Sequence, residues 1–350
     1  MSKIKVGIIG MGAIGTVHAD AYRTCDQAEL TALCDVSKAR LASEGTRLNI
    51  SQRFRDYREL LQSDVEAVSV CVGNALHREV AVAALKAGKH ILLEKPMAMN
   101  AREANAIIAA GAKARKVIQI GMVRRQAAPV QLAKNYVEKG LLGKIYHIRT
   151  VFIRRRGIPG LGGWFTTKSM SGGGPLIDLG VHFFDAAMYV SGLWQPTRVS
   201  AMTYAKFGVP MQAYKYVSMW AGPPKYNGTF DVEDYTAGLV RFGKNAAMSF
   251  EIAWAANTEN ANFIDILGDK GGLRMLDSKP MVLFTEHNGN IVDITPQVAK
   301  VNPFHIQAAK FITACRGKCP PAATAREGLY VMKLLDAVYK SAELGKEVTL

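Results

Sequence analysis

Short apolar runs alternate with amphipathic stretches over the first 120 residues of the chain. The apolar runs have the length of buried strands, and the amphipathic stretches have the length and flanking caps of helices. Strands are expected at 4–9, 29–34, 67–72, 91–93 and 117–120, and helices at 13–24, 38–44, 76–87 and 101–114. Apolar strands separated by helices predict a parallel sheet covered on both faces, in an α/β, doubly wound fold of the Rossmann type.

The pattern changes after Gly121. A helix is expected over 126–138, then longer strands of mixed character with Gly-rich turns, and two closing helices. The strands are expected at 144–155, 197–205, 235–242, 246–253 and 263–267, and the closing helices at 303–315 and 325–344. Such strands predict an α+β domain with a large, mostly antiparallel open sheet. We therefore expect a Rossmann domain over 1–122 and an α+β domain over 123–350.

Composition is that of an ordinary globular protein, with 49% hydrophobic and 21% charged residues in a chain of 350. These values exclude disordered, collagen-like and coiled-coil classes. No apolar run reaches the roughly 18 residues of a membrane-spanning helix, and the N-terminal apolar stretch lacks a signal-peptide cleavage site. The five cysteines are odd in number and scattered, which favours a cytoplasmic protein with reduced thiols and no metal site.

Positive charge is concentrated in one segment of a chain whose net charge is +15. Between Val123 and Lys168 the chain carries ten Lys and Arg residues, and Glu138 is the single acid. This segment has three interpretations: a solvated surface, a pocket in which one or two arginines meet a polyhydroxylated or anionic ligand, or a nucleic-acid patch. Because no nucleic-acid-binding motif accompanies the charge, no nucleic-acid partner is expected.

A glycine motif marks a dinucleotide site. Gly10-Met11-Gly12-Ala13-Ile14-Gly15 follows the first expected strand and opens the first expected helix. The first glycine permits a tight turn, the second lets the backbone approach a pyrophosphate at the helix N-terminus, and the third allows close helix–strand packing.

An acidic residue lies about twenty residues further on, as this motif requires. Asp35 ends the second expected strand and is placed to accept hydrogen bonds from ribose hydroxyls. Its charge would repel a 2′-phosphate, which favours NAD over NADP. Lys38 and Arg40 are able to partner such a phosphate, so NADP stays the less favoured alternative.

Three further segments carry polar groups suited to chemistry. Glu94-Lys95-Pro96 directly follows a strand of the parallel sheet, where a doubly wound fold places its ligand crevice. Asn74 and His77 lie in the loop after the preceding strand. A Gly-rich stretch from Gly172 precedes a helix expected to begin at Pro175, with Asp178 and His182 one turn apart on one face.

These motifs together resemble the Gfo/Idh/MocA oxidoreductases over essentially the whole chain. The resemblance rests on the glycine motif, on AGKHILLEKPMA (87–98) and on GGGPLIDLGVHFFD (172–185). It implies a nicotinamide cofactor in the first domain and a sugar or cyclitol against the open sheet of the second. It also implies a homodimer or homotetramer formed through that sheet. The chain departs from the family where Val72-Gly73 replaces the usual Thr-Pro before Asn74.

Within that family the chain looks most like a branch of glucoside 3-dehydrogenases and inositol dehydrogenases. The segment RRRGIPG (154–160) and GWFTTK (163–168) carries this narrower likeness. It implies a ring hydroxyl as the reacting group, with C3 of a glucoside as one position. The substrate-binding candidates are Arg155, Trp164 and Thr166, together with Asp178 and His182. Beside the glycine motif and Asp35, the cofactor-binding candidates are Asn74, His77, Glu94, Lys95 and Arg124.

Oxidation of a carbinol needs a base for the hydroxyl proton and an acceptor for the hydride, which NAD provides. His182 has the pKa range of a base at neutral pH, Asp178 is placed to orient it, and Lys95 to stabilise a developing alkoxide. The assignment of the base between His182 and Lys95 stays open. Two other readings stay open as well: a redox-neutral glycoside lyase or glycosidase that retains NAD, and a non-catalytic NAD-binding regulator.

Overall fold

The computed structural model describes residues 2–217, 219–276 and 280–350. The chain divides into two compact units, one of Met1–Gln126 with Asn302–Leu329 and one of Ala127–Val301 with Tyr330–Leu350. This division lies close to the boundary expected at residue 122, but it assigns 302–329 to the first unit. The reason is that Phe311 and Ile312 of α9 (Pro303–Cys315) belong to the hydrophobic core of that unit.

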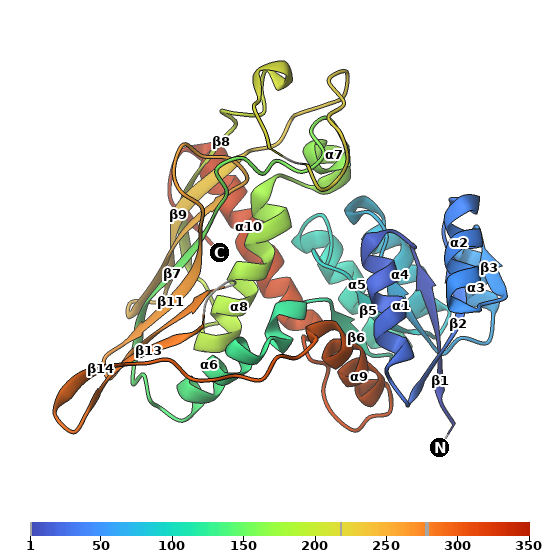
Figure 1. Ribbon diagram of the computed structural model, residues 1–350, viewed down its shortest axis with the longest axis horizontal. Helices are drawn as coiled ribbons and strands as arrows, with labels where there is room; N and C mark the ends of the chain where they lie inside the picture. The colour runs from blue at the N-terminus through green and yellow to red at the C-terminus, as the bar shows by residue number, and fades with distance from the viewer. Residues whose placement is uncertain (1, 218, 277–279) are drawn as a thin grey trace. The chain divides into compact units, whose positions relative to one another are not determined.

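The first unit holds a six-stranded sheet in the order β3-β2-β1-β4-β5-β6, with every pair parallel (Figure 1). Its strands are β1 (Ile4–Ile9), β2 (Ala28–Cys34), β3 (Gln52–Phe54), β4 (Ala67–Val70), β5 (His90–Leu93) and β6 (Ile118–Ile120). Its helices between the strands are α1 (Ala13–Arg23), α2 (Lys38–Leu48), α3 (Tyr57–Gln62), α4 (His77–Lys86) and α5 (Ala101–Ala114). This order confirms the predicted doubly wound fold, and the chain reverses direction along the sheet between β1 and β4.

Side chains that cap two of these helices explain where the helices begin. The Ser37 hydroxyl accepts a hydrogen bond from the Arg40 backbone N–H (3.3 Å), and the Asn100 side chain accepts one from Glu103 N–H (3.0 Å). Each cap satisfies a backbone donor that lacks a partner within the helix. The sequence pattern missed β3 and α3, which are too short to show a clear period.

The second unit holds a nine-stranded sheet in the order β14-β13-β12-β11-β7-β10-β9-β8-β15. The strands are β7 (Ile145–Ile153), β8 (Arg198–Tyr204), β9 (Tyr235–Phe242), β10 (Ala246–Ala253), β11 (Ala261–Gly268), β12 (Gly272–Leu276), β13 (Val282–His287), β14 (Asn290–Ile294) and β15 (Val348–Thr349). Only β7 and β10 pair in parallel among these strands, so the predicted mostly antiparallel sheet is confirmed.

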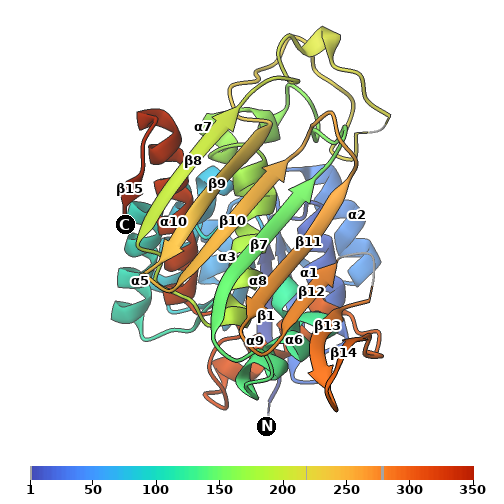
Figure 2. The same ribbon diagram turned by 90° about the vertical axis from the view of Figure 1, so that its left-hand side faces the viewer.

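Helices lie against one face of this sheet. They include α6 (Ala128–Glu138), α8 (Val181–Ser191) and the second half of α10 (Ala325–Leu344), whereas the short α7 (Lys168–Ser171) lies in the connection between β7 and α8. Phe183 of α8 packs on Phe152 of β7 with ring centroids 5.1 Å apart, and Phe184 packs on Phe250 of β10 at 5.0 Å. Neighbouring residues of a strand point to opposite faces, so Val151 and Ile153 point away from α8. Among the residues that the structure describes, Figure 2 shows no helix of this unit over that second face.

Within residues 2–217, 219–276 and 280–350, no helix is both long and apolar enough to cross a membrane. Among the same residues, no three His, Cys, Asp or Glu side chains are grouped as metal ligands. The five cysteines form no disulfide with one another.

Candidate active site

The glycine motif forms the turn between β1 and α1 in the first unit. Gly10 has a φ of +97°, and a Cβ there would lie 2.5 Å from the carbonyl oxygen of Cys71, so the turn requires glycine. A Cβ at Gly15 would collide with the Gly10 carbonyl oxygen. Gly12 is the N-cap of α1, and a Cβ there would meet nothing within 4 Å. The space beside Gly12 is therefore open at a helix N-terminus, as a bound pyrophosphate requires.

Asp35 is tied to this turn. One carboxylate oxygen accepts a hydrogen bond from the Met11 N–H (2.8 Å), and the other accepts one from Ser37 N–H (2.8 Å). An Arg40 guanidinium nitrogen lies 3.7 Å from the same carboxylate. A carboxylate has about four lone-pair positions, so each oxygen retains capacity for a ribose hydroxyl. The residues present thus fit an NAD cofactor, with Gly10–Gly15 holding its phosphates and Asp35 its ribose.

A buried polar network lies beneath the Glu94-Lys95-Pro96 turn. His18 of α1 and Glu94 pair at 3.0 Å, and both side chains are almost fully buried. The other ring nitrogen of His18 contacts the Ser69 hydroxyl at 3.1 Å, and Ser69 contacts Tyr22 at 2.8 Å. The second Glu94 oxygen accepts a hydrogen bond from the backbone N–H of Lys95 (3.1 Å). The network therefore fixes the backbone from which the Lys95 side chain departs.

The ionisation of this pair follows from its contacts. Burial favours the neutral forms of both groups. For Glu94, the hydrogen bond and charge of His18 outweigh burial and hold its pKa below the ordinary value. For His18, contacts with Cys71 and Glu94 outweigh burial and raise its pKa above the ordinary value. We therefore treat the pair as an imidazolium and a carboxylate.

The loop after β4 carries Asn74 and His77. His77 is fully buried, and its ring nitrogens lie 2.6 Å from the Pro96 carbonyl oxygen and 3.0 Å from the Val72 carbonyl oxygen. The ring thereby joins the β4 loop to the Lys95 turn. Asn74 is 8% exposed and opens a short 3₁₀ segment, η1 (Asn74–Leu76). This geometry favours a positioning role for His77, and its contact with the cofactor stays a prediction.

Asp178 and His182 lie in the second unit, where the predicted helix has an irregular first turn. The segment η4 (Leu176–Gly180) is π-helical and leads directly into α8. The expectation of an unbroken α-helix from Pro175 is therefore wrong over this turn. Single π turns occur often at functional sites, because the wider turn shifts the side chains that follow. Both Asp178 and His182 are half-buried.

Two residues that the sequence analysis did not identify hold this turn. The indole N–H of Trp254, at the end of β10, donates a hydrogen bond to the Asp178 carboxylate (3.1 Å). The buried Glu233 carboxylate accepts hydrogen bonds from the N–H groups of Gly174 (3.0 Å) and Leu176 (3.2 Å) and from the Tyr339 hydroxyl (2.9 Å). Burial raises the pKa of Glu233, and the hydrogen bonds offset part of that effect. Neither residue belongs to a motif that spacing alone reveals.

The substrate-binding candidates differ in their surroundings. The Thr166 hydroxyl is buried, accepts from Gly162 N–H (3.0 Å) and lies 2.7 Å from the Thr229 carbonyl oxygen, so it joins two loops. Trp164 is 39% exposed. Arg155 is exposed, and its backbone N–H donates to the Asn260 side chain (2.8 Å).

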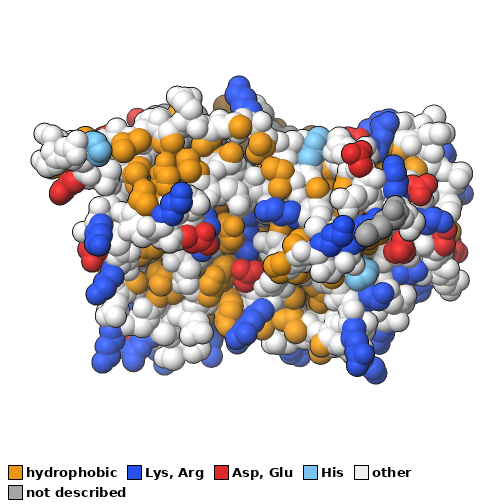
Figure 3. All heavy atoms as spheres, turned by 90° about the horizontal axis from the view of Figure 1, so that it is seen from below, with side chains coloured by type: hydrophobic (Ala, Val, Ile, Leu, Met, Phe, Trp, Pro, Cys, Tyr) orange, Lys and Arg blue, Asp and Glu red, His pale blue; other side chains and the backbone are white. Residues whose placement is uncertain are grey.

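The basic segment of 123–168 is distributed over several elements with separate partners. Arg125 is buried and pairs with Glu327 (3.1 Å), Arg149 pairs with Asp265 (3.3 Å), and Arg156 stacks over Phe207 at 4.6 Å. Arg124 lies in the 3₁₀ segment η2 (Val123–Gln126) and is half-buried. Figure 3 likewise shows Lys and Arg side chains scattered over the face drawn rather than gathered in one patch.

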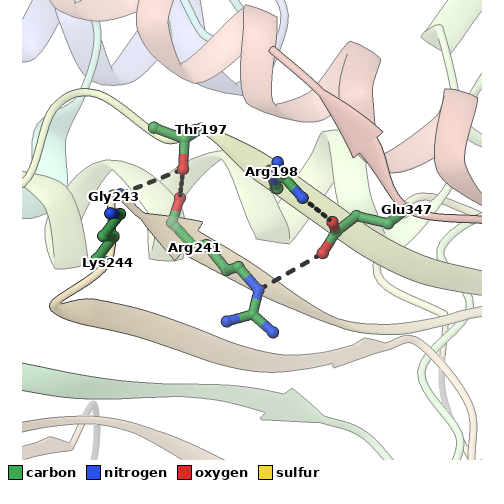
Figure 4. A pocket seen from close by; sticks show the side chains of 6 residues that line it. All are labelled: Thr197, Arg198, Arg241, Gly243, Lys244 and Glu347. Carbon is green, nitrogen blue, oxygen red and sulfur yellow. Dashed lines mark hydrogen bonds and ion pairs between the residues drawn. The ribbon is translucent and has the colours of Figure 1, made fainter.

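A shallow hollow of about 480 Å³ lies at one end of the large sheet. Its lining is Thr197, Arg198, Arg241, Gly243, Lys244 and Glu347 (Figure 4). Glu347 pairs with Arg198 (3.1 Å) and Arg241 (3.5 Å), and its carboxylate balances one of the three positive charges in the lining. None of the predicted site residues lines this hollow.

A Rossmann unit with an open glycine turn, joined to an α+β unit with an open sheet, is the architecture of a two-domain dinucleotide-binding protein. Comparison with family models agrees. Residues 4–122 match the model described as oxidoreductase family, NAD-binding Rossmann fold, and residues 130–274 match the GFO/IDH/MocA C-terminal domain. The chain belongs to the GFO/IDH/MocA oxidoreductase family. The predicted family, fold class and NAD cofactor are thereby confirmed.

Individual proteins of known name are similar to this chain. D-glucoside 3-dehydrogenase of Escherichia coli (strain K12) is 32% identical over 354 residues, covering 100% of this chain and 98% of the relative. Myo-inositol 2-dehydrogenase of Thermotoga maritima is 33% identical over 190 residues, covering 54% and 55%. The solved structure of levoglucosan dehydrogenase in complex with NADH superposes with a TM-score of 0.87 at 23% identity, covering 99% of each chain, and supports the fold. The chain is thus an NAD-dependent oxidoreductase of the CH–OH class.

Proposed function

We propose that this enzyme transfers a hydride between a ring hydroxyl of a sugar, glycoside or cyclitol and NAD. The observation that carries the proposal is the combination of an open dinucleotide turn at Gly12 with a π-helical turn that presents Asp178 and His182. A relative that is similar over its whole length is named a D-glucoside 3-dehydrogenase. C3 of a glucoside is therefore the position to test first.

The residues have distinct proposed roles. NAD supplies the hydride acceptor when bound. The Lys95 ammonium donates a hydrogen bond to the reacting oxygen and stabilises its negative charge, and His182 accepts the hydroxyl proton. Asp178, oriented by Trp254, holds His182 or a neighbouring hydroxyl. Should Lys95 instead accept the proton, His182 would take the hydrogen-bonding role, so the two assignments are tested together.

Other predicted residues keep binding roles in this proposal. The glycine turn, Asp35, Asn74 and Arg124 bind the cofactor, and Arg155 and Trp164 bind the sugar. Glu94, His77 and Thr166 act through the loops that they hold, because their polar groups are buried and bonded to neighbouring backbone or to His18.

Formation of NADH in the presence of sugars tests the function. A panel of hexoses, glucosides and inositols is offered with NAD or NADP, and cofactor reduction is followed by absorbance. We expect stoichiometric NADH with at least one pyranoside or cyclitol. Cleavage of a glycosidic bond without net NADH would instead support the redox-neutral lyase or glycosidase, which the dehydrogenase names of the relatives do not favour.

We also propose that the enzyme is a homodimer or homotetramer formed through the uncovered sheet face. That face carries an apolar cluster of Val151, Ile153, Ala253 and Ala256. Phe263 packs against it between the guanidinium groups of Arg149 (5.3 Å) and Arg274 (4.5 Å). Light scattering of wild type and Phe263→Asp checks this: the wild type should be an oligomer and the variant should dissociate. A monomeric wild type would contradict the proposal.

We also propose a cytoplasmic location, which fits the five cysteines that form no disulfide.

A further inference from the structure

Three aromatic side chains form a partly exposed group at one end of the large sheet. The rings of Trp164 and Phe165 are tilted by 32° with centroids 3.8 Å apart, and Trp220 meets the Phe165 ring edge-on at 5.1 Å. Trp220 is 64% exposed and Trp164 39% exposed. We call Trp164, Phe165 and Trp220 the aromatic shelf. Indole rings left in water are unfavourable unless something covers them, so an exposed cluster of this kind marks a binding surface.

The shelf is connected to the proposed catalytic helix through one buried side chain. The Phe165 ring meets the edge of Trp254 at 6.4 Å, and Trp254 is fully buried. The Trp254 indole N–H donates to the Asp178 carboxylate at 3.1 Å. A continuous path of aromatic contacts therefore runs, within the second unit, from Asp178 out to Trp220.

Two loops that build the shelf are pinned to each other. The segment from 156 to 168 bonds to the β8–β9 connection through Lys225 N–H to the Leu161 carbonyl (2.7 Å) and Lys168 N–H to the Asp231 carboxylate (2.6 Å). Within the β8–β9 connection itself, the Asp234 carboxylate near its end accepts hydrogen bonds from the backbone N–H groups of residues 206–208 near its start. Figure 1 shows the two segments side by side near α7. A surface ordered before binding loses little entropy when a ligand docks.

We propose that the aromatic shelf binds the second ring of a glycoside, the sugar or aryl group attached to the ring that is oxidised. The inference rests on the proposed function. A pyranose or aryl ring has a flat apolar face that stacks on an indole, and Trp220 and Trp164 offer such faces at the outer end of the path from Asp178. A free monosaccharide held at Asp178 has no second ring to occupy the shelf. The enzyme is therefore selective for extended glycosides over free sugars and over glycosides with a small substituent.

The test compares a phenyl glycoside with the methyl glycoside of the same sugar. Trp220→Ala changes an exposed position, so the fold should survive. Tyr146→Ala is the matched control. Tyr146 is 52% exposed and lies near the beginning of β7, whereas the chain reaches Trp164 after the end of that strand. We expect Trp220→Ala to lower kcat/KM for the phenyl glycoside about tenfold through KM, the size of one stacking contact. The methyl glycoside should change by less than about twofold, and the control should change neither.

Several results would overturn the proposal. Equal losses on both glycosides would show that Trp220 only supports the fold of the loops. A wild type that prefers the methyl glycoside, or a Trp220→Ala variant that changes oligomeric state by light scattering, would assign the shelf to packing or to a subunit contact.

Failure of the proposed function gives a different result. If none of the sugars offered supports NAD reduction by the wild type, the shelf is still testable by calorimetry. The measurement compares binding of the phenyl glycoside to wild type and to Trp220→Ala. Tighter binding to the wild type supports the shelf, and equal or absent binding refutes it.

Discussion

Replacing His18 with leucine is expected to leave the Glu94 carboxylate buried without its cationic partner. Glu94 is 6% exposed, and its remaining hydrogen bond comes from the Lys95 backbone. Removal of one member of a buried ion pair typically costs about 3–5 kcal/mol, because the other charge stays desolvated. Replacement of both members by apolar residues of similar volume is often close to neutral. His18→Leu with Glu94→Met should therefore recover most of the stability that His18→Leu loses.

The assay must report on the first unit alone. The four tryptophans, at 164, 194, 220 and 254, all belong to the second unit, so their fluorescence serves as an internal control. Amide hydrogen exchange of peptides that cover β1, β4 and β5 reads the first unit. Protection there should fall at least about a hundredfold in His18→Leu and return in the double variant. A loss below about fivefold in His18→Leu would refute the buried ion pair.

The stability that the His18–Glu94 pair contributes to the first unit should change with pH in a defined direction. The raised pKa of His18 means that its contribution is fully present below the ordinary histidine value of about 6.5 and is lost as pH rises through the raised value. The lowered pKa of Glu94 means that its contribution is present above the ordinary value and is lost as pH falls through the lowered value. The stability advantage of wild type over the double variant should thus decline on the alkaline side of neutrality. A flat difference would contradict the assigned charges.

The remaining predictions concern catalysis, cofactor choice and the π turn. Lys95→Ala and His182→Ala should each lower turnover about 10²–10⁴-fold while calorimetry still detects NAD binding; near-normal turnover in either would reject that role. Asp35→Ala should weaken NAD binding and improve NADP relative to it in the same titration, and an unchanged ratio would reject the ribose contact. The raised pKa of Glu233 should make the second unit less stable as pH rises from about 4.3 through the raised value, read as the urea midpoint of tryptophan fluorescence. Glu233→Gln should lack this decline; its persistence would assign the effect to other groups.

The fold was largely predictable from the chain because its signals are local. The β1 strand, the glycine turn and the Ser37 and Asn100 caps each depend on a few adjacent residues. The strands β9 and β10 occur where alternation predicts them, at Tyr235–Phe242 and Ala246–Ala253. The assignment of α9 to the first unit was not predictable in this way, since it depends on packing between segments about 290 residues apart.

The candidate site was predictable only in part. Motif residues such as Lys95, Asp178 and His182 stand out because their types and spacing are unusual. The residues that hold them do not stand out in the sequence. In the first unit His18 pairs with Glu94 beside Lys95, and in the second Glu233 and Trp254 bond to the turn that carries Asp178. No sequence spacing links these residues to the motifs. The π turn at Leu176–Gly180 was also not predictable, because the helical period of the sequence does not distinguish it from an α-helix.

The most direct measurement is a paired analysis of one reaction, in which NADH and the sugar product are quantified together. With NAD and a pyranoside that binds, we expect one NADH for each molecule of sugar converted to its keto derivative, with the glycosidic bond intact. This ratio should disappear in Lys95→Ala and in His182→Ala. Sugar conversion without NADH, or conversion that persists unchanged in both variants, would contradict the proposed dehydrogenase chemistry.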